Sequence, residues 1–127
     1  MDKPMQRKPK LYFDTAANPS HVTFDDGTEE RRNVPWMNYA EARWAHVEPN
    51  TIRIQIGELV IVITGHNLAP LFLAIEDQTL TRVCAQPDFR QDREREIDTF
   101  AVEIRFMKPP AKLPARPQGQ SEFDLLG

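Results

Sequence analysis

The centre of the chain has the clearest pattern, an alternation of aliphatic and polar residues that leads into an apolar run. From residue 51 to residue 56, aliphatic side chains occupy every second position, which is the period of a half-buried β-strand. Gly57 and Glu58 follow, and five aliphatic residues in a row begin at Leu59. Because glycine tolerates the positive φ of the first position of a type II′ turn, this spacing predicts a tight hairpin.

A two-residue turn also determines which residues face each other across the hairpin. Three aliphatic pairs are expected to share one face: Ile56 with Leu59, Ile54 with Ile61, and Ile52 with Ile63. Cross-strand packing favours such pairs, so the turn and the alternation indicate the same register. The second strand is also apolar on its other face, at Val60 and Val62. We therefore expect it to be covered or central in its sheet.

A short amphipathic helix is predicted directly after the hairpin. Apolar residues recur between Leu68 and Ile75 with the spacing of one helical face, which we expect to pack on the hairpin. Asn67 is a natural N-cap, and Pro70 would lie in the first turn, where its missing N–H costs no helical bond. Since proline disfavours helical geometry at the preceding residue, a helix that begins at Pro70 itself stays open.

Two further strands are predicted in the second half of the chain. Residues 80–85 and 99–106 are rich in apolar side chains, and the second of these segments alternates with polar positions. The segment between them is almost entirely charged from residue 90 to residue 98. It is expected to be a solvated loop or a short helix with internal ion pairs.

The first half of the chain is more ambiguous. Residues 40–47 fit a strand, but a helix over 38–46 competes because alanine, glutamate and arginine favour helices. Residues 22–24 and 30–34 flank an Asp26-Gly27 turn and predict a polar outer hairpin at an edge.

Together these elements predict an α+β domain. It would contain a largely antiparallel sheet of about five or six strands, with one main amphipathic helix packed on a face. The sequence has no internal repeat, and no run of alternating strands and helices indicates a doubly wound sheet.

Charge and proline content divide the 127-residue chain into a body and two appendages. Residues 1–10 form a basic arm of net charge +3, which is expected to be flexible. Residues 108–127 have a net charge of +1 and four prolines within nine positions, which predicts an extended tail. The body, residues 11–107, is expected to be a single domain with a net charge of −7. Because nucleic-acid affinity rests largely on neutralising phosphates, so acidic a body argues against a nucleic-acid partner.

Composition places the chain in the ordinary globular class and in a reducing compartment. Hydrophobic residues make up 40 % and charged residues 28 % of the chain. The single cysteine, Cys84, excludes an intramolecular disulfide and a cysteine-based zinc site. The longest apolar run is too short to cross a bilayer, and the basic start lacks the apolar segment of a secretory signal. A cytoplasmic location without membrane contact is therefore expected.

The sequence contains no motif with catalytic or metal-binding spacing. His21, His46 and His66 are widely separated, so we predict neither a metal nor a cofactor and no catalytic residue. His66 and Asn67 form the one candidate ligand site, because they connect a strand to the start of a helix, where backbone N–H groups can face an anion. An ordinary turn and helix cap explains the same two residues.

Two groups of large apolar residues are candidates for binding a protein partner. Trp36 and Tyr39 lie in an aromatic cluster of the kind that interface centres enrich, although the area that an aromatic gains by burial favours a place in the core. Phe123, Leu125 and Leu126 end the proline-rich tail. Such a peptide gains by docking in a groove of a partner or of a second copy, and a frayed end is the alternative.

The sequence thus favours a non-catalytic protein-interaction or regulatory module that self-associates or docks a partner. The alternative is a small-ligand or anion-binding domain, enzyme or not, whose site is the turn around His66 and Asn67. Nucleic-acid binding through the basic arm is the third and least favoured hypothesis, given the acidic body.

Overall fold

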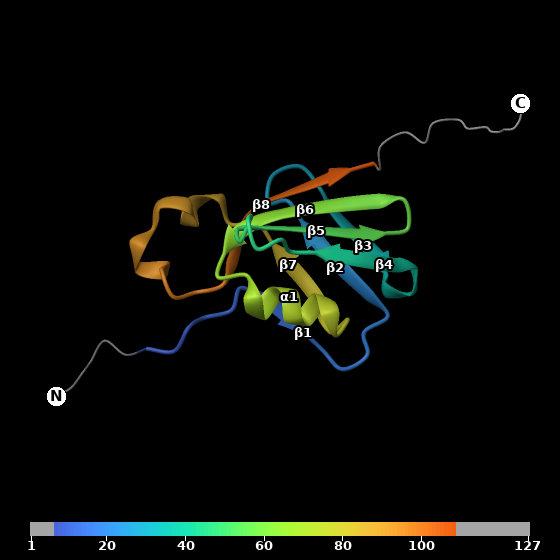
Figure 1. The fold of residues 1–127 in the computed structure, drawn as a ribbon, viewed down its shortest axis with the longest axis horizontal. Helices are drawn as coiled ribbons and strands as arrows, with labels where there is room; N and C mark the ends of the chain where they lie inside the picture. The colour runs from blue at the N-terminus through green and yellow to red at the C-terminus, as the bar shows by residue number, and fades with distance from the viewer. Residues whose placement is uncertain (1–6, 109–127) are drawn as a thin grey trace, which may run out of the picture.

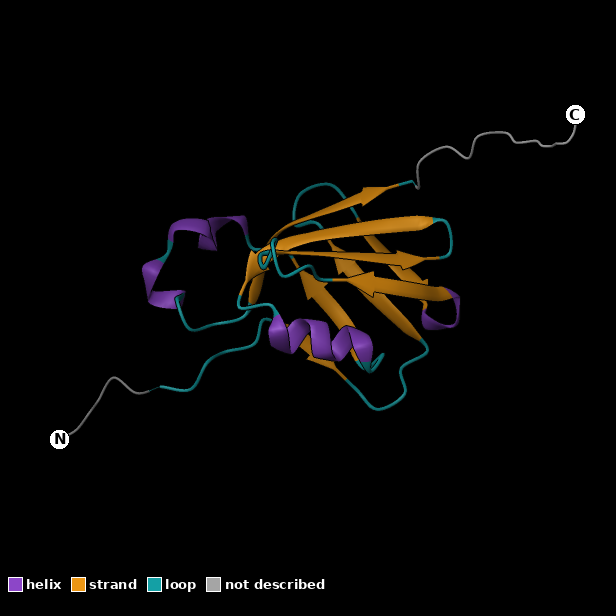
Figure 2. Cartoon of the chain, viewed as in Figure 1, coloured by secondary structure: helices purple, strands orange, loops and turns teal. Residues whose placement is uncertain are grey.

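In the part of the chain that the structure describes, two four-stranded β-sheets and one α-helix make up the fold (Figures 1 and 2). The computed structural model describes residues 7–108. The strands are β1 Phe13–Thr15, β2 His21–Asp25, β3 Arg31–Pro35, β4 Tyr39–Arg43, β5 Thr51–Ile56, β6 Leu59–His66, β7 Leu80–Cys84 and β8 Phe100–Met107. The helix α1 is Ala69–Glu76, and three short 3₁₀ turns are η1 Trp36–Asn38, η2 Pro87–Gln91 and η3 Arg93–Arg95.

The predicted α+β class is confirmed, but the number of strands and their layering differ from the prediction. Eight strands form two sheets, with orders β1-β7-β2-β3 and β4-β5-β6-β8, where one sheet of about five or six was expected. All neighbouring strands are antiparallel except β2 and β7, which pair in parallel. That parallel pair builds a sheet from segments far apart in the chain, which local patterns do not reveal.

The β5–β6 hairpin has the predicted register. Ile56 pairs with Leu59, and the two other aliphatic pairs follow from it, Ile54 with Ile61 and Ile52 with Ile63. Gly57, the first residue of the turn, has a φ of +61°, whereas Glu58, the second, is not among the described residues with positive φ. A type II′ turn requires this combination. The strand β6 is central, between β5 and β8, as its two apolar faces indicated.

The helix begins one residue before Pro70, and the prediction of Asn67 as its N-cap is wrong. Leu68 occupies the cap position without a side-chain hydrogen bond, and Pro70 lies in the first turn. Asn67 has a φ of +51°, and its side chain points away from the helix start to bond the segment before β8. The apolar side of α1 packs into the same core as the hairpin, through residues such as Leu71 and Ile75.

The strand β4 covers residues 39–43, so the strand predicted over 40–47 is present only in its first half. The competing helix over 38–46 does not form, and helical geometry is confined to the short turn η1 before β4. The predicted outer hairpin is also present, as β2 and β3. Only β3 lies at an edge, however, because β2 is covered on its other side by β7. Val22 and Phe24 of β2 are fully buried, so this hairpin contributes to the core.

A single core joins the inner faces of both sheets and the helix. It contains Val22 and Phe24 of β2, Ile52, Ile54 and Ile56 of β5, Ile61 and Ile63 of β6, Leu71, Ala74 and Ile75 of α1, Leu80 and Val83 of β7, and Ile104 of β8. Trp36, from η1, is also part of this core. Its indole N–H donates to the carbonyl of Leu80, 2.9 Å away, and so connects η1 to β7.

The charged segment before β8 forms two 3₁₀ turns, η2 and η3, and contains an ion pair between Arg95 and Asp92. Its end is not solvated as predicted, because Asp98 and Thr99 are buried. Burial of a carboxylate requires compensating partners, and Arg7 and the backbone N–H of Lys10 supply them.

Candidate functional site

The strand-to-helix turn at His66 and Asn67 anchors the segment that precedes β8. The Nε2 atom of His66 lies 2.7 Å from the carbonyl oxygen of Glu96, so it is the protonated nitrogen that donates. The side-chain amide of Asn67 donates to the carbonyls of Glu96 and Asp98, at 2.9 and 3.1 Å. In return, the hydroxyl of Thr99 donates to the carbonyl of Asn67 at 2.6 Å.

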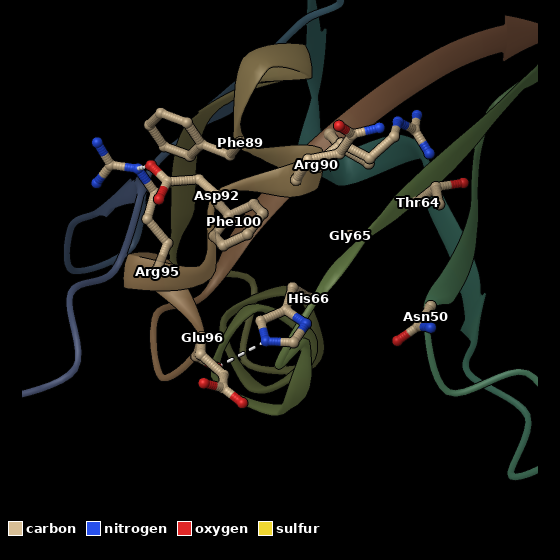
Figure 3. A pocket seen from close by; sticks show the side chains of 12 residues that line it. Asn50, Thr64, Gly65, His66, Phe89, Arg90, Asp92, Arg95, Glu96 and Phe100 are labelled. Atoms are coloured by element: carbon tan, nitrogen blue, oxygen red, sulfur yellow. Dashed lines mark hydrogen bonds and ion pairs between the residues drawn. The ribbon is translucent and has the colours of Figure 1, made fainter.

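A cleft of about 720 Å³ lies beside this anchor, between the η2–η3 segment and the adjoining ends of β6 and β8 (Figure 3). Its side chains are of mixed character, and it includes His66 but not Asn67. The His66 ring lies against the Phe100 ring, with 5.5 Å between the centroids. An anion at the His66-Asn67 turn would compete with the Glu96 carbonyl for the same N–H groups. The two side-chain donors of this turn are therefore already bonded, and an anion site at His66 and Asn67 stays a prediction.

The charge of Arg95 beside the cleft is already balanced. Its guanidinium carbon lies 3.9 Å from the centroid of the Phe89 ring, and its Nη1 donates to the hydroxyl of Tyr12 at 2.6 Å. The Nε atom lies 2.9 Å from Asp92 Oδ2, but its N–H does not point at that oxygen, so the contact is an ion pair without a directed hydrogen bond. We therefore assign Arg95 a structural role in the segment.

The segment after residue 6 is fastened to the body by an ion pair. Arg7 contacts both carboxylate oxygens of Asp98, at 2.8 and 3.2 Å, and the backbone N–H of Lys10 donates to the same carboxylate at 2.9 Å. The hydrogen bond from Arg7 is the main cause that holds the pKa of Asp98 below its ordinary value. Residues 1–6 lie outside the described residues, so the flexible arm over 1–10 stays a prediction.

Cys84 offers a poor nucleophile. It lies half-buried in β7, where burial is the main cause that raises the pKa of its thiol, with a further contribution from the charge of Asp25. The thiol is therefore protonated at neutral pH. Within residues 7–108, no three histidine, cysteine, aspartate or glutamate side chains converge on a position that could hold a metal ion.

The predicted partner-binding residues occupy different environments. Trp36 is 4 % exposed and belongs to the core, so its ring is not available at the surface. Tyr39 is half-buried and meets Trp36 edge-on, with 5.4 Å between the ring centroids. Phe123, Leu125 and Leu126 lie outside the described residues, and so does the rest of the tail beyond Lys108.

The structure adds a candidate that the sequence did not indicate, the outer edge of β8. Among the strands of residues 7–108, only β6 pairs with β8 along its length, and a single parallel bridge joins Ala101 to Ala85 on the other side. The N–H of Gln86 donates to the carbonyl of Ala101 at 2.8 Å. Within residues 7–108, no strand pairs with this side of β8 after Ala101.

The hairpin register shows which backbone groups of β8 point outward. Ile56 and Leu59 close a two-residue turn, so they are a hydrogen-bonded pair, and the odd-numbered residues of β6 bond to β5. The even-numbered residues of β6 therefore bond to β8, where their partners are Glu103, Arg105 and Met107. By alternation, the N–H and C=O groups of Ile104 and Phe106 face away from β6. We call this outward side, over residues 102–107, the β8 edge.

A groove of about 650 Å³ runs along the β8 edge. One wall is residues 102–107 of β8, and the turn between β2 and β3 contributes Asp26, Thr28, Glu29 and Glu30. The guanidinium of Arg32, from β3, lies 5.1 Å from the centroid of the Phe106 ring. The groove thus follows the side on which the edge strands β3 and β8 of the two sheets approach each other.

Comparison with known proteins identifies no relative: no protein-family model, curated protein or solved structure gave a significant match. No helix within residues 7–108 has the length and apolar character needed to cross a membrane.

Proposed function

We propose that the chain is a non-catalytic protein-interaction module that binds an extended strand of its partner along the β8 edge. The observation that supports this is a row of outward backbone groups, at Ile104 and Phe106, that no described strand satisfies. Exposed N–H and C=O groups of an edge strand form a template for strand addition, in which main-chain hydrogen bonds supply affinity.

Of the four sheet edges, β8 has the least protection against pairing. The strand β1 has three residues, β4 has five with an irregular register near Tyr39, and β3 contains Arg31, Arg32 and Pro35. Short length, bulges, charges and proline are the features by which proteins block unwanted pairing. The strand β8 also has two charged residues, Glu103 and Arg105, and an irregular register before Glu103, but it is the longest of the four edge strands and has no proline.

The chemistry of the remaining candidates supports binding rather than catalysis. The raised pKa of Cys84 disfavours a thiolate nucleophile, and the Nε2 proton of His66 is bound to a backbone carbonyl. A cytoplasmic location is part of the proposal, because the lone cysteine suits a reducing compartment.

A site-specific crosslink tests the proposed function. A photoreactive benzoylphenylalanine replaces Met107, which is 45 % exposed at the end of β8, and a control chain has the same residue at Glu41 on β4, the opposite edge of the same sheet. After irradiation in concentrated solution and in cell lysate, mass spectrometry identifies the crosslinked segment. An adduct with a strand-forming segment of another protein molecule at Met107 but not at Glu41 supports the proposal. An adduct confined to the same chain, or a yield no greater than that at Glu41, overturns it.

A further inference from the structure

We infer that the partner strand at the β8 edge is β8 of a second copy, antiparallel and related by a two-fold axis at Ile104. This inference rests on the proposed function and specifies the partner and the register. It predicts a dimer in which the β4-β5-β6-β8 sheets of two copies join into one continuous sheet. Isologous pairing of this kind is the commonest way in which identical chains associate.

Backbone geometry restricts the two-fold registers of such a pair to a few. Because outward groups alternate along β8, residues 104 and 106 must face other outward-facing residues of the second copy. The carbonyl of Ala101 is already bonded to Gln86, so pairing can use only the residues from 102 onward. Pairing of both residues within this range allows an axis at residue 104, 105 or 106, and pairing of Ile104 alone also allows an axis at residue 103.

Charge distinguishes these registers. Glu103 and Arg105 lie on the same exposed face of β8, 48 % and 56 % exposed, with 3.9 Å between Oε2 and Nε. An axis at residue 103 places Glu103 opposite its own copy, and an axis at residue 105 does the same for Arg105, so both registers oppose like charges. An axis at residue 106 does not place Glu103 and Arg105 opposite each other, so these residues form no ion pair across the interface.

Only the axis at Ile104 pairs opposite charges across the interface. Glu103 of each copy then lies opposite Arg105 of the other, which gives two symmetric ion pairs. Both pairs occupy non-hydrogen-bonded positions, where facing side chains come closest. At the same time Ile104 faces its own copy, and residue 102 faces Phe106. Charge complementarity therefore selects this register and argues for a second copy as the occupant.

Charge reversal with complementation tests the inference on the full chain. Glu103→Arg places two positive charges in each cross-strand pair, and Arg105→Glu places two negative charges there. Because like charges then face each other, either variant alone should dimerise with a dissociation constant at least about tenfold higher than that of the wild type. A mixture of the two variants places arginine opposite glutamate in both pairs and should form a one-to-one heterodimer. Sedimentation analysis measures all four samples.

A matched control lies on the other edge of the same sheet. Glu41 and Arg43 of β4 form a similar exposed ion pair at 3.8 Å, so Glu41→Arg should leave dimerisation unchanged. A monomeric wild type, a dimer that persists in both single variants, or a mixture that stays monomeric overturns the inference. Failure of the proposed function has a different signature, because the Met107 crosslink would then capture no other protein molecule. Capture of a different protein at Met107 overturns only the self-pairing.

Discussion

Arg7 and Asp98, 91 residues apart in the chain, form a two-point contact in which the guanidinium meets both carboxylate oxygens at 2.8 and 3.2 Å. The carboxylate is fully buried, whereas half of the Arg7 side chain is exposed. Asp98 also accepts the N–H of Lys10, and its own carbonyl accepts from Asn67. This one residue therefore connects the start of the described chain, the turn before α1 and the segment that leads into β8.

The folded protein should lose stability in acid because Asp98 becomes protonated. The pKa of Asp98 is lowered in the folded state, mainly by the Arg7 hydrogen bond. The stability that the Asp98 carboxylate contributes is therefore fully present above the ordinary aspartate pKa of about 4, and it is lost as the pH falls through the lowered pKa. Urea unfolding at several pH values should show Asp98→Asn less stable than the wild type at neutral pH, with the difference shrinking below about pH 4. The exposed Asp88→Asn is the control. A constant difference at all pH values would contradict the role of the carboxylate charge.

Gly65 should tolerate a methyl group less well than Gly57. A Cβ at Gly65 would lie 2.2 Å from the carbonyl oxygen of Phe100 and 2.9 Å from Ala101 Cα, so β6 and β8 would have to separate. We expect Gly65→Ala to destabilise by about 3 kcal/mol or more. A Cβ at Gly57 would meet Asn38 at an ordinary contact distance of 3.7 Å, so Gly57→Ala loses only the glycine preference for positive φ, about 1–2 kcal/mol. Denaturant midpoints rank the two variants, and equal losses would contradict the close approach of the strands.

Asn67 should hold the η2–η3 segment by its side chain and permit the turn by its backbone. Asn67→Gly removes the hydrogen bonds to Glu96 and Asp98, but glycine still adopts the positive φ without strain. Asn67→Ala removes the same hydrogen bonds and also strains the backbone at this φ. Both variants should be cut by trypsin within residues 90–95 faster than the wild type. The alanine variant should be less stable than the glycine variant by about 1 kcal/mol. Unchanged cleavage rates would show that the anchor lies elsewhere.

The hairpin register predicts a sharp difference between its two faces. Ile61 is fully buried opposite Ile54, so Ile61→Asp places an unpaired charge in the core, and Ile61→Ala should cost about 2–5 kcal/mol. Arg53, on the exposed face of β5, should tolerate alanine within about 1 kcal/mol. Thermal unfolding compares the three variants. A near-neutral Ile61→Asp would mean that the register is wrong.

The sequence sufficed for features that depend on neighbouring residues. The pairing of Ile52 with Ile63 follows from a two-residue turn and an alternating pattern, and both are local. The helix position follows from apolar spacing, with Pro70 marking its first turn. The sequence also indicates a capping role for Asn67, but its side-chain amide bonds the segment before β8 rather than the start of the helix.

Features that depend on distant residues were not accessible in this way. The parallel pairing of Phe24 with Val83 joins two segments that lie far apart in the chain, and it assembles the β1-β7-β2-β3 sheet. The buried state of Asp98 depends on Arg7, which the sequence places in a charged arm. β8 was predicted as a strand, but its edge position depends on strand order, which hydrophobic periodicity does not encode.

Hydrogen exchange at individual backbone amides tests the β8 edge most directly. In dilute protein, the N–H groups of Glu103, Arg105 and Met107 should be protected by β6, while those of Ile104 and Phe106 exchange rapidly. In concentrated protein, Ile104 and Phe106 should become protected as well, with the other three unchanged. If Ile104 and Phe106 exchange equally fast at both concentrations while the protein is dimeric, the dimer does not form through this edge and the central claim is contradicted.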